Sequence, residues 1–265
     1  PAAAAAAGRG VRDVLDGGTG RDRVSYRTRA GGVRVDLAAR RGADGDLLRG
    51  IEDAEGGAGA DVLRGSRGPN RLYGLGRGDV LEGRAGGDTL TGGEGPDRSL
   101  GGSGHDLLEG EESGPDATDR DGCGSGRDTV RLPRHADRVG SDCERAVVGD
   151  GTWEARVALP LTVARDGNVS VRLFDTRGAG SFAGRATLRF GALFLGRPSR
   201  VVRLRRGGRA TARVRIVRAA LTRLRASGRL TVIVGVGAAG FTTILRPPGT
   251  PPPRRRTGPS GGTPA

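Results

Sequence analysis

The chain has 265 residues, of which 51 are glycine and only 3% are aromatic, and its formal net charge is +14. So much glycine and so little aromatic bulk argue against one thick core and favour thin layers of structure. Residues 1–150 carry 22 arginines against 27 acidic residues (−5), whereas residues 151–265 carry 22 against three (+19). We therefore expect the two halves to do different jobs.

The first 55 residues contain an irregular start. Pro1 and six alanines are expected to be disordered with the rest of residues 1–10, either just after a small-residue cleavage site or at an arbitrary boundary. Residues 17–25 form one Gly/Asp-rich nonapeptide, and the alternation over 33–37 predicts a strand. We interpret 11–55 as the beginning of a solenoid.

A nine-residue repeat then fills residues 56–109 without an insertion. Its first place is always glycine: Gly56, Gly65, Gly74, Gly83, Gly92 and Gly101. Its sixth place is acidic or an amide: Asp61, Asn70, Asp79, Asp88, Asp97 and Asp106. Its eighth place is leucine in every block except the one with Ser99. A Gly-rich linker has no reason to keep this register.

The repeat resembles G-G-x-G-x-D-x-U-x, the nonapeptide of RTX-type calcium-binding β-helices. Proteins of that family are hemolysin-type repeat proteins exported by bacteria. The resemblance implies that six residues of each block form a calcium-binding turn and three form a short strand. It also implies that two blocks make one coil of a parallel β-roll, with leucine facing inward.

Sixth-place residues eighteen positions apart should then lie on adjacent coils, roughly 4.8 Å apart. One stack is Asp61, Asp79 and Asp97, and the other is Asn70, Asp88 and Asp106. Stacked carboxylates repel each other by roughly 3 kcal/mol at an effective dielectric constant near 20. Calcium suits such oxygen donors, whereas zinc would need Cys or His and this segment has only His105.

These six residues are the predicted ligands of several calcium ions, with Asp22 and Asp46 as further candidates that turn formation explains about as well. Because Asn70 offers a neutral amide, the site it shares with Asp88 is expected to be weaker. One buried leucine per nine residues returns too little free energy to order the chain, so we expect the roll to need calcium to fold.

Residues 110–149 are expected to cap the roll. The register breaks after Gly110 and returns at residues 123–130, with Cys123 in the first glycine place. A disulfide between Cys123 and Cys143 would close a loop of about twenty residues and stabilise this end by roughly 3 kcal/mol. Two free thiols are the alternative.

Residues 150–246 change to period-two alternation, which predicts half-buried strands and a small basic β-sandwich of about seven strands. A short helix is expected over 219–226. Arginines occupy the outward places, as a solvated face or as a surface for an anionic polymer. Aromatic platforms for specific nucleic-acid binding are scarce. Residues 247–265 are rich in Pro, Arg and Gly and are expected to be a disordered tail.

No motif supports an enzyme. Residues 235–240 match a dinucleotide fingerprint, but no acidic residue follows Asp175, and a hairpin turn explains the segment better. The uncharged stretch 230–245 is too short for a membrane span. We therefore expect an all-β, extracellular calcium-binding protein. The alternatives are a cell-surface adhesin that uses the basic half, with the roll as a spacer, and the export module of a larger enzyme.

Overall fold

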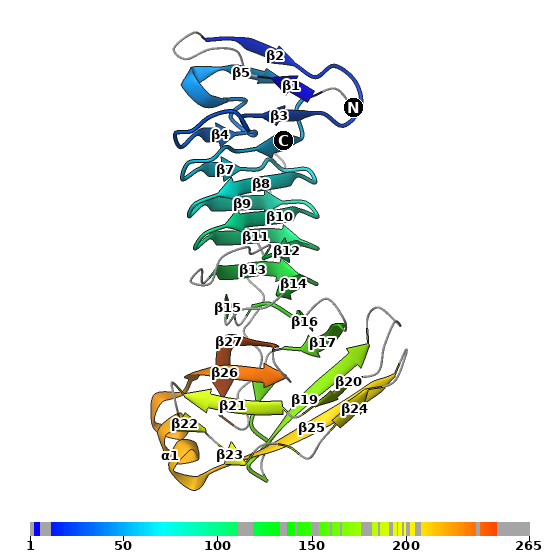
Figure 1. The fold of residues 1–265 in the computed structure, drawn as a ribbon, viewed down its shortest axis with the longest axis vertical. Helices are drawn as coiled ribbons and strands as arrows, with labels where there is room; N and C mark the ends of the chain where they lie inside the picture. Colours follow the sequence, from blue (N-terminus) through cyan, green and yellow to red (C-terminus); the bar gives the residue numbers. More distant parts are fainter. Residues whose placement is uncertain are drawn as a thin grey trace, which may run out of the picture.

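The computed structural model describes residues 3–5, 12–110, 119–132, 137–140, 142–149, 154–159, 161–164, 166–175, 182–184, 186–190, 193–194, 196–197, 199, 202–204, 208–236 and 239–247. The predicted tail, apart from Pro247, and most of residues 1–10 lie outside these ranges. The regular elements of the described chain are almost all strands, with a tall roll at one end and mostly antiparallel strands at the other (Figure 1). This confirms the predicted fold class.

The roll consists of two parallel sheets. The first contains β1 (Ala3–Ala5), β3 (Arg23–Ser25), β6 (Asp53–Glu55), β8 (Arg71–Gly76), β10 (Thr89–Glu94), β12 (Leu107–Glu109), β14 (Thr129–Leu132) and β16 (Arg145–Gly149). The second contains β4 (Arg34–Asp36), β7 (Val62–Arg64), β9 (Val80–Ala85), β11 (Arg98–Gly104), β13 (Arg120–Gly126) and β15 (Asp137–Val139). Leu72 pairs with Leu90, and Leu63 with Leu81, so one coil spans eighteen residues as the repeat predicts.

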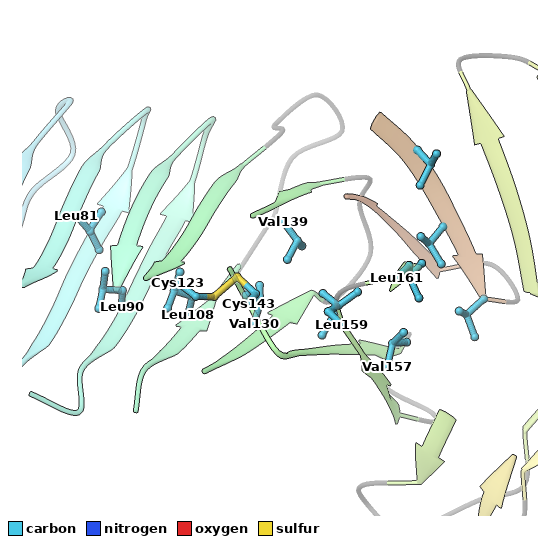
Figure 2. Packing of buried hydrophobic residues seen from close by; sticks show 14 of the residues in the cluster. Leu81, Leu90, Leu108, Cys123, Val130, Val139, Cys143, Val157, Leu159 and Leu161 are labelled. Carbon is cyan, nitrogen blue, oxygen red and sulfur yellow. A yellow bond between two sulfur atoms is a disulfide. The ribbon is translucent and has the colours of Figure 1, made fainter. Parts of the chain in front are cut away.

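The eighth-place leucines form the core of the roll. Leu63, Leu72, Leu81, Leu90 and Leu108 are fully buried and stack from coil to coil, because alternate strand residues face inward. Figure 2 shows Leu81, Leu90 and Leu108 inside the roll. Val130 and Val139 continue the core beyond the regular repeats.

The N-terminal coil is irregular. It includes β2 (Val14–Asp16), which pairs with β5 (Leu47–Arg49), and a short 3₁₀ turn, η1 (Ala43–Gly45). The buried Tyr26 hydroxyl donates to Oδ2 of Asp46 (3.1 Å) and accepts the backbone N–H of Ala43. In contrast to the predicted disorder of residues 1–10, β1 pairs with β3, because the edge of the first sheet offers backbone groups that a short strand can satisfy.

A disulfide joins Cys123 and Cys143 inside the C-terminal end of the roll, as predicted. Both cysteines are buried and belong to the same hydrophobic cluster as the leucines (Figure 2). The bridge therefore closes the roll from within its core.

The C-terminal half is built mostly from antiparallel strand pairs, with one short parallel pair between residues 161–162 and 245–246. The strands are β17 (Glu154–Ala158), β18 (Leu161–Thr162), β19 (Asn168–Asp175), β20 (Phe182–Gly184), β21 (Ala186–Phe190), β22 (Leu193–Phe194), β23 (Gly196–Arg197), β24 (Val202–Leu204), β25 (Arg209–Ile216), β26 (Leu230–Val236) and β27 (Ala239–Arg246). The helix α1 (Arg218–Ser227) covers the predicted helical segment. β26 pairs antiparallel with β27, so residues 235–240 connect a hairpin, as predicted.

Both sheets of the roll continue into this C-terminal region. In the first sheet β16 pairs antiparallel with β17, and in the second sheet β15 pairs parallel with β27. Val157, Leu159 and Leu161 join one hydrophobic cluster with the residues of the roll (Figure 2). The C-terminal strands therefore cover the last coil, whose edges would otherwise be open.

Candidate calcium sites

The sixth-place residues lie in two rows, one on each side of the roll. The first row contains Asp61, Asp79 and Asp97, and the second contains Asn70, Asp88 and Asp106. None of the six is more than 3% exposed. Along each row, the backbone N–H of one residue donates to Oδ1 of the residue one coil later, over 2.7–2.8 Å. The structure thus brings together the two stacks that the spacing predicts.

Both rows extend further than the regular repeats indicate. Asp97 donates its N–H to Oδ1 of Asp119 (2.8 Å), and Asp106 donates to Oδ1 of Asp128 (2.9 Å). Asp128 in turn donates to Oε2 of Glu144 (2.7 Å). These three acids were absent from the predicted ligands because the spacing changes from eighteen residues to 22 at Asp119 and Asp128 and to 16 at Glu144. The recovered register at 123–130 was the signal that could have identified Asp128.

The two further candidates differ in position. Asp22 is buried, and its N–H donates to Oε2 of Glu52 (3.0 Å), at the N-terminal end of the second row. Asp46 lies in the irregular coil, where its Oδ1 accepts the N–H of Asp13 and its Oδ2 accepts the Tyr26 hydroxyl. These bonds use both oxygens of Asp46 to hold the coil together.

The first glycine of each block makes room for the acid. A Cβ on Gly74 would overlap with Oδ2 of Asp79 and would press on the carbonyl oxygen of Gly92. The same overlap recurs between Gly92 and Oδ2 of Asp97. Glycine is therefore required where the carboxylate turns inward and meets the backbone.

Five later turns share one backbone conformation: 74–79, 83–88, 92–97, 101–106 and 123–128. Their second and fourth places have positive φ, as in Gly93 (104°) and Gly95 (117°). Turn 74–79 keeps this conformation although the residues there are Leu75 (85°) and Arg77 (69°). Residues other than glycine adopt positive φ rarely and at a cost in free energy. The shape of turn 74–79 is therefore determined by its stacking on the neighbouring coils and not by the conformational preference of its own residues.

One carboxylate oxygen in each of these turns has no donor. Oδ2 is buried and lacks a hydrogen-bond partner in Asp79, Asp88, Asp97, Asp106 and Asp128. Burial raises the pKa of Asp79 to about 8, with Asp97 and Asp61 adding repulsion. Burial also raises the pKa to about 6 in four further acids: Asp88, Asp97, Asp106 and Asp128. Such oxygens need either a proton or a cation.

The donor set fits calcium. Among the described residues no three acidic, histidine or cysteine side chains converge on one point, so an ion would take backbone carbonyl oxygens besides carboxylates. Calcium accepts this mixture in flexible geometry. Zinc prefers sulfur and nitrogen ligands, and in the described part of the chain both cysteines are bridged and Nδ1 of His105 accepts the N–H of Arg127. The acids with an unpartnered Oδ2 would hold the ion, which would neutralise their charge.

A comparison with known families agrees with this geometry. The family model of the RTX calcium-binding nonapeptide repeat (4 copies) matches residues 8–25, 55–76 and 73–108. These repeats are RTX calcium-binding nonapeptide repeats. No curated protein matches the chain. Turn 123–128 lies outside the matched residues, yet Gly124 (93°) and Gly126 (153°) have positive φ at the same two places as the matched turns.

Proposed function

We propose that this is a secreted, non-enzymatic calcium-binding protein whose roll becomes ordered when calcium binds between its coils. The observation that supports it is the buried, unpartnered Oδ2 that recurs on successive coils. A calcium ion there satisfies the oxygen and cancels the repulsion between stacked acids. The oxygen atoms that would bind calcium are therefore also those that destabilise the metal-free roll, so binding of the ion and folding of the roll are coupled.

Secretion would make the coupling between calcium binding and folding useful to the cell. Extracellular calcium modules typically bind with dissociation constants of about 10⁻⁴–10⁻³ M, far above the free calcium of a cytoplasm. The calcium-binding coils of the roll would stay unfolded inside the cell and become ordered after export. No helix in the described part of the chain is long and apolar enough to cross a membrane.

Calcium titration of the full chain tests the proposal. Far-ultraviolet circular dichroism should gain strand signal with millimolar calcium and lose it with chelator. Magnesium at equal concentration is the control, since it prefers a rigid octahedral site and keeps its water. An unchanged spectrum together with no calcium uptake in calorimetry would refute the proposal.

A second candidate function is adhesion to an anionic polymer. Arg172 on β19 and Arg209, Arg213 and Arg215 on β25 are exposed on one face of the paired strands. The residues that alternate with them, such as Val171 and Val214, are buried. The same pattern also suits a solvated face in an arginine-rich protein, so charge alone does not decide between them.

Matched charge variants decide it. Heparin is a suitable model polymer, and Arg172→Gln/Arg213→Gln should weaken its binding and reduce its salt dependence. Arg71→Gln/Arg98→Gln removes the same charge from exposed positions of the roll. Equal weakening by both pairs would show that binding follows net charge and not this face.

A further inference from the structure

The first two regular turns are built differently from those that follow. In turns 56–61 and 65–70 no residue has positive φ. Gly57 donates its N–H to Oδ2 of Asp61 (2.6 Å), and Ser66 donates its N–H to Oδ1 of Asn70 (2.6 Å). Each of these turns is therefore closed by the side chain of its own sixth residue.

Neither Asp61 nor Asn70 has the unpartnered oxygen that marks the later turns. Oδ1 of Asp61 accepts the N–H of Val33 (2.7 Å), so both of its oxygens have backbone donors. The Asn70 amide donates to the carbonyl oxygen of Glu52 (2.6 Å) while its oxygen accepts Ser66. The atoms that need a cation in Asp79 or Asp88 are already satisfied here.

A guanidinium group lies on turn 65–70. Arg84 donates to the carbonyl oxygen of Gly65 (3.0 Å) and to both oxygens of Asp36 (2.7 and 2.9 Å). Burial is the largest single effect and would raise the pKa of Asp36, but the Arg84 hydrogen bonds, the backbone N–H of Ala39 and the charges of Arg84 and Arg64 together hold that pKa below its usual value. The cation thus links three successive coils through a carbonyl oxygen and a carboxylate.

A second guanidinium group lies on the other side of the same turn. Arg21 donates to both oxygens of Asp53 (2.7–3.1 Å) and reaches the carbonyl oxygen of Pro69 at 3.4 Å. Carbonyl and carboxylate oxygens are the partners that calcium takes, and a guanidinium group satisfies them through fixed hydrogen bonds instead. Asn70 is neutral, and the positive groups in contact with turn 65–70 are the side chains of Arg21 and Arg84.

We propose that calcium occupies the roll only from turn 74–79 onward, and that turns 56–61 and 65–70 are metal-independent, with the Arg84 guanidinium group in the place of the ion at turn 65–70. This inference rests on the proposed function for the later turns. It makes the N-terminal coils a preformed end of the roll. The neutral Asn70 then belongs to a turn that has no ion rather than to a weak calcium site.

Ion counts on the full chain test the first part. Native mass spectrometry should find the same number of calcium ions in Asp61→Asn as in the unmodified protein, and fewer in Asp79→Asn. Both variants place an amide at a sixth position, as Asn70 does naturally, so they are matched. Equal losses in the two variants would overturn the inference.

Hydrogen exchange in chelator tests the second part independently of calcium. The amides of Gly57 and Ser66 should exchange at least about tenfold more slowly than that of Gly93, because only the first two turns are closed without metal. Arg84→Gln should accelerate exchange at Ser66 by about tenfold or more, since bonds to a charged group are lost, whereas Arg98→Gln should not. Protection of Gly57 and Ser66 only after calcium addition overturns the inference. Absence of calcium-induced protection everywhere would instead contradict the proposed function.

Discussion

Asp79 should make the metal-free roll less stable as the pH rises. Burial first, and then the charges of Asp97 and Asp61, raise its pKa to about 8 in the folded state, against about 3.9 in an unfolded chain. Between these values the folded state holds a proton that the unfolded state has lost, so stability falls as pH increases. From pH 5 to pH 8 the loss is about 4 kcal/mol for Asp79.

Four further acids act in the same direction. Asp88, Asp97, Asp106 and Asp128 have pKa values of about 6, and each should add about 1 kcal/mol of loss over the same interval. Asp79→Asn removes the largest contribution, because an amide cannot ionise. In chelator the variant should therefore be more stable than the unmodified protein at pH 8, although it binds less calcium.

Urea unfolding of the full chain in chelator measures this, followed by circular dichroism at pH 5, where the acids are protonated, and at each higher pH up to 8 at which the metal-free roll still shows an unfolding transition. The pH-dependent difference in the free energy of unfolding should shrink by about 4 kcal/mol in Asp79→Asn. Asp166→Asn is the control, because Asp166 is exposed and its hydrogen bonds with Asn168 hold its pKa below the usual value. A metal-free protein that gains stability from pH 5 to pH 8, or an Asp79→Asn variant that does not alter the slope, would refute the reasoning.

Three further changes test the roll in calcium. Cys123→Ala/Cys143→Ala should lower the free energy of unfolding by about 3 kcal/mol, because the loop of twenty residues is no longer closed. Leu90→Ala should cost about 2–5 kcal/mol, since Leu90 is fully buried in the ladder. Arg77→Gly should stabilise the roll by up to about 1 kcal/mol, because Arg77 is exposed with φ of 69°. Denaturant midpoints measure all three.

Each of these has an outcome that contradicts it. An unchanged midpoint for the cysteine variant under non-reducing conditions would mean that the bridge does not constrain the unfolded chain. A loss below about 1 kcal/mol for Leu90→Ala would show that the ladder is loosely packed. Destabilisation by Arg77→Gly would mean that its side chain makes a contact worth more than the relief of its backbone conformation.

Periodicity made the roll predictable. Eighteen-residue stacking, inward leucines and the two rows of acids follow from one register, and the cysteine spacing led to the observed bridge. The C-terminal strands and the 235–240 hairpin followed from alternation. The assignment of the acids as calcium ligands stays a prediction, supported by their burial and unpartnered oxygens.

The sequence could not indicate contacts between segments that are not related by the nine-residue repeat. The pairing of β15 with β27 joins segments about a hundred residues apart, and no pattern connects them. Arg84 meets Asp36 across 48 positions, so its role at turn 65–70 was invisible in a block that looks like its neighbours. β1 was missed because an alanine run carries little strand preference, and only the open edge of the sheet recruits it.

The strands of the roll lie across the long axis of the molecule, and the C-terminal strands continue the same two sheets (Figure 1). Hydrogen bonds between coils therefore run along that axis, and a pull along it detaches the coils one after another from the pulled end instead of all together. Each coil of eighteen residues that yields would lengthen the chain by roughly 55–60 Å. Anchored at residue 247 and pulled from residue 12, the roll would extend in regular steps until the Cys123–Cys143 bridge stops the unzipping. A stack of equal coils would thus dissipate a pulling force in repeated steps, and bound calcium would set the force at which each coil unfolds.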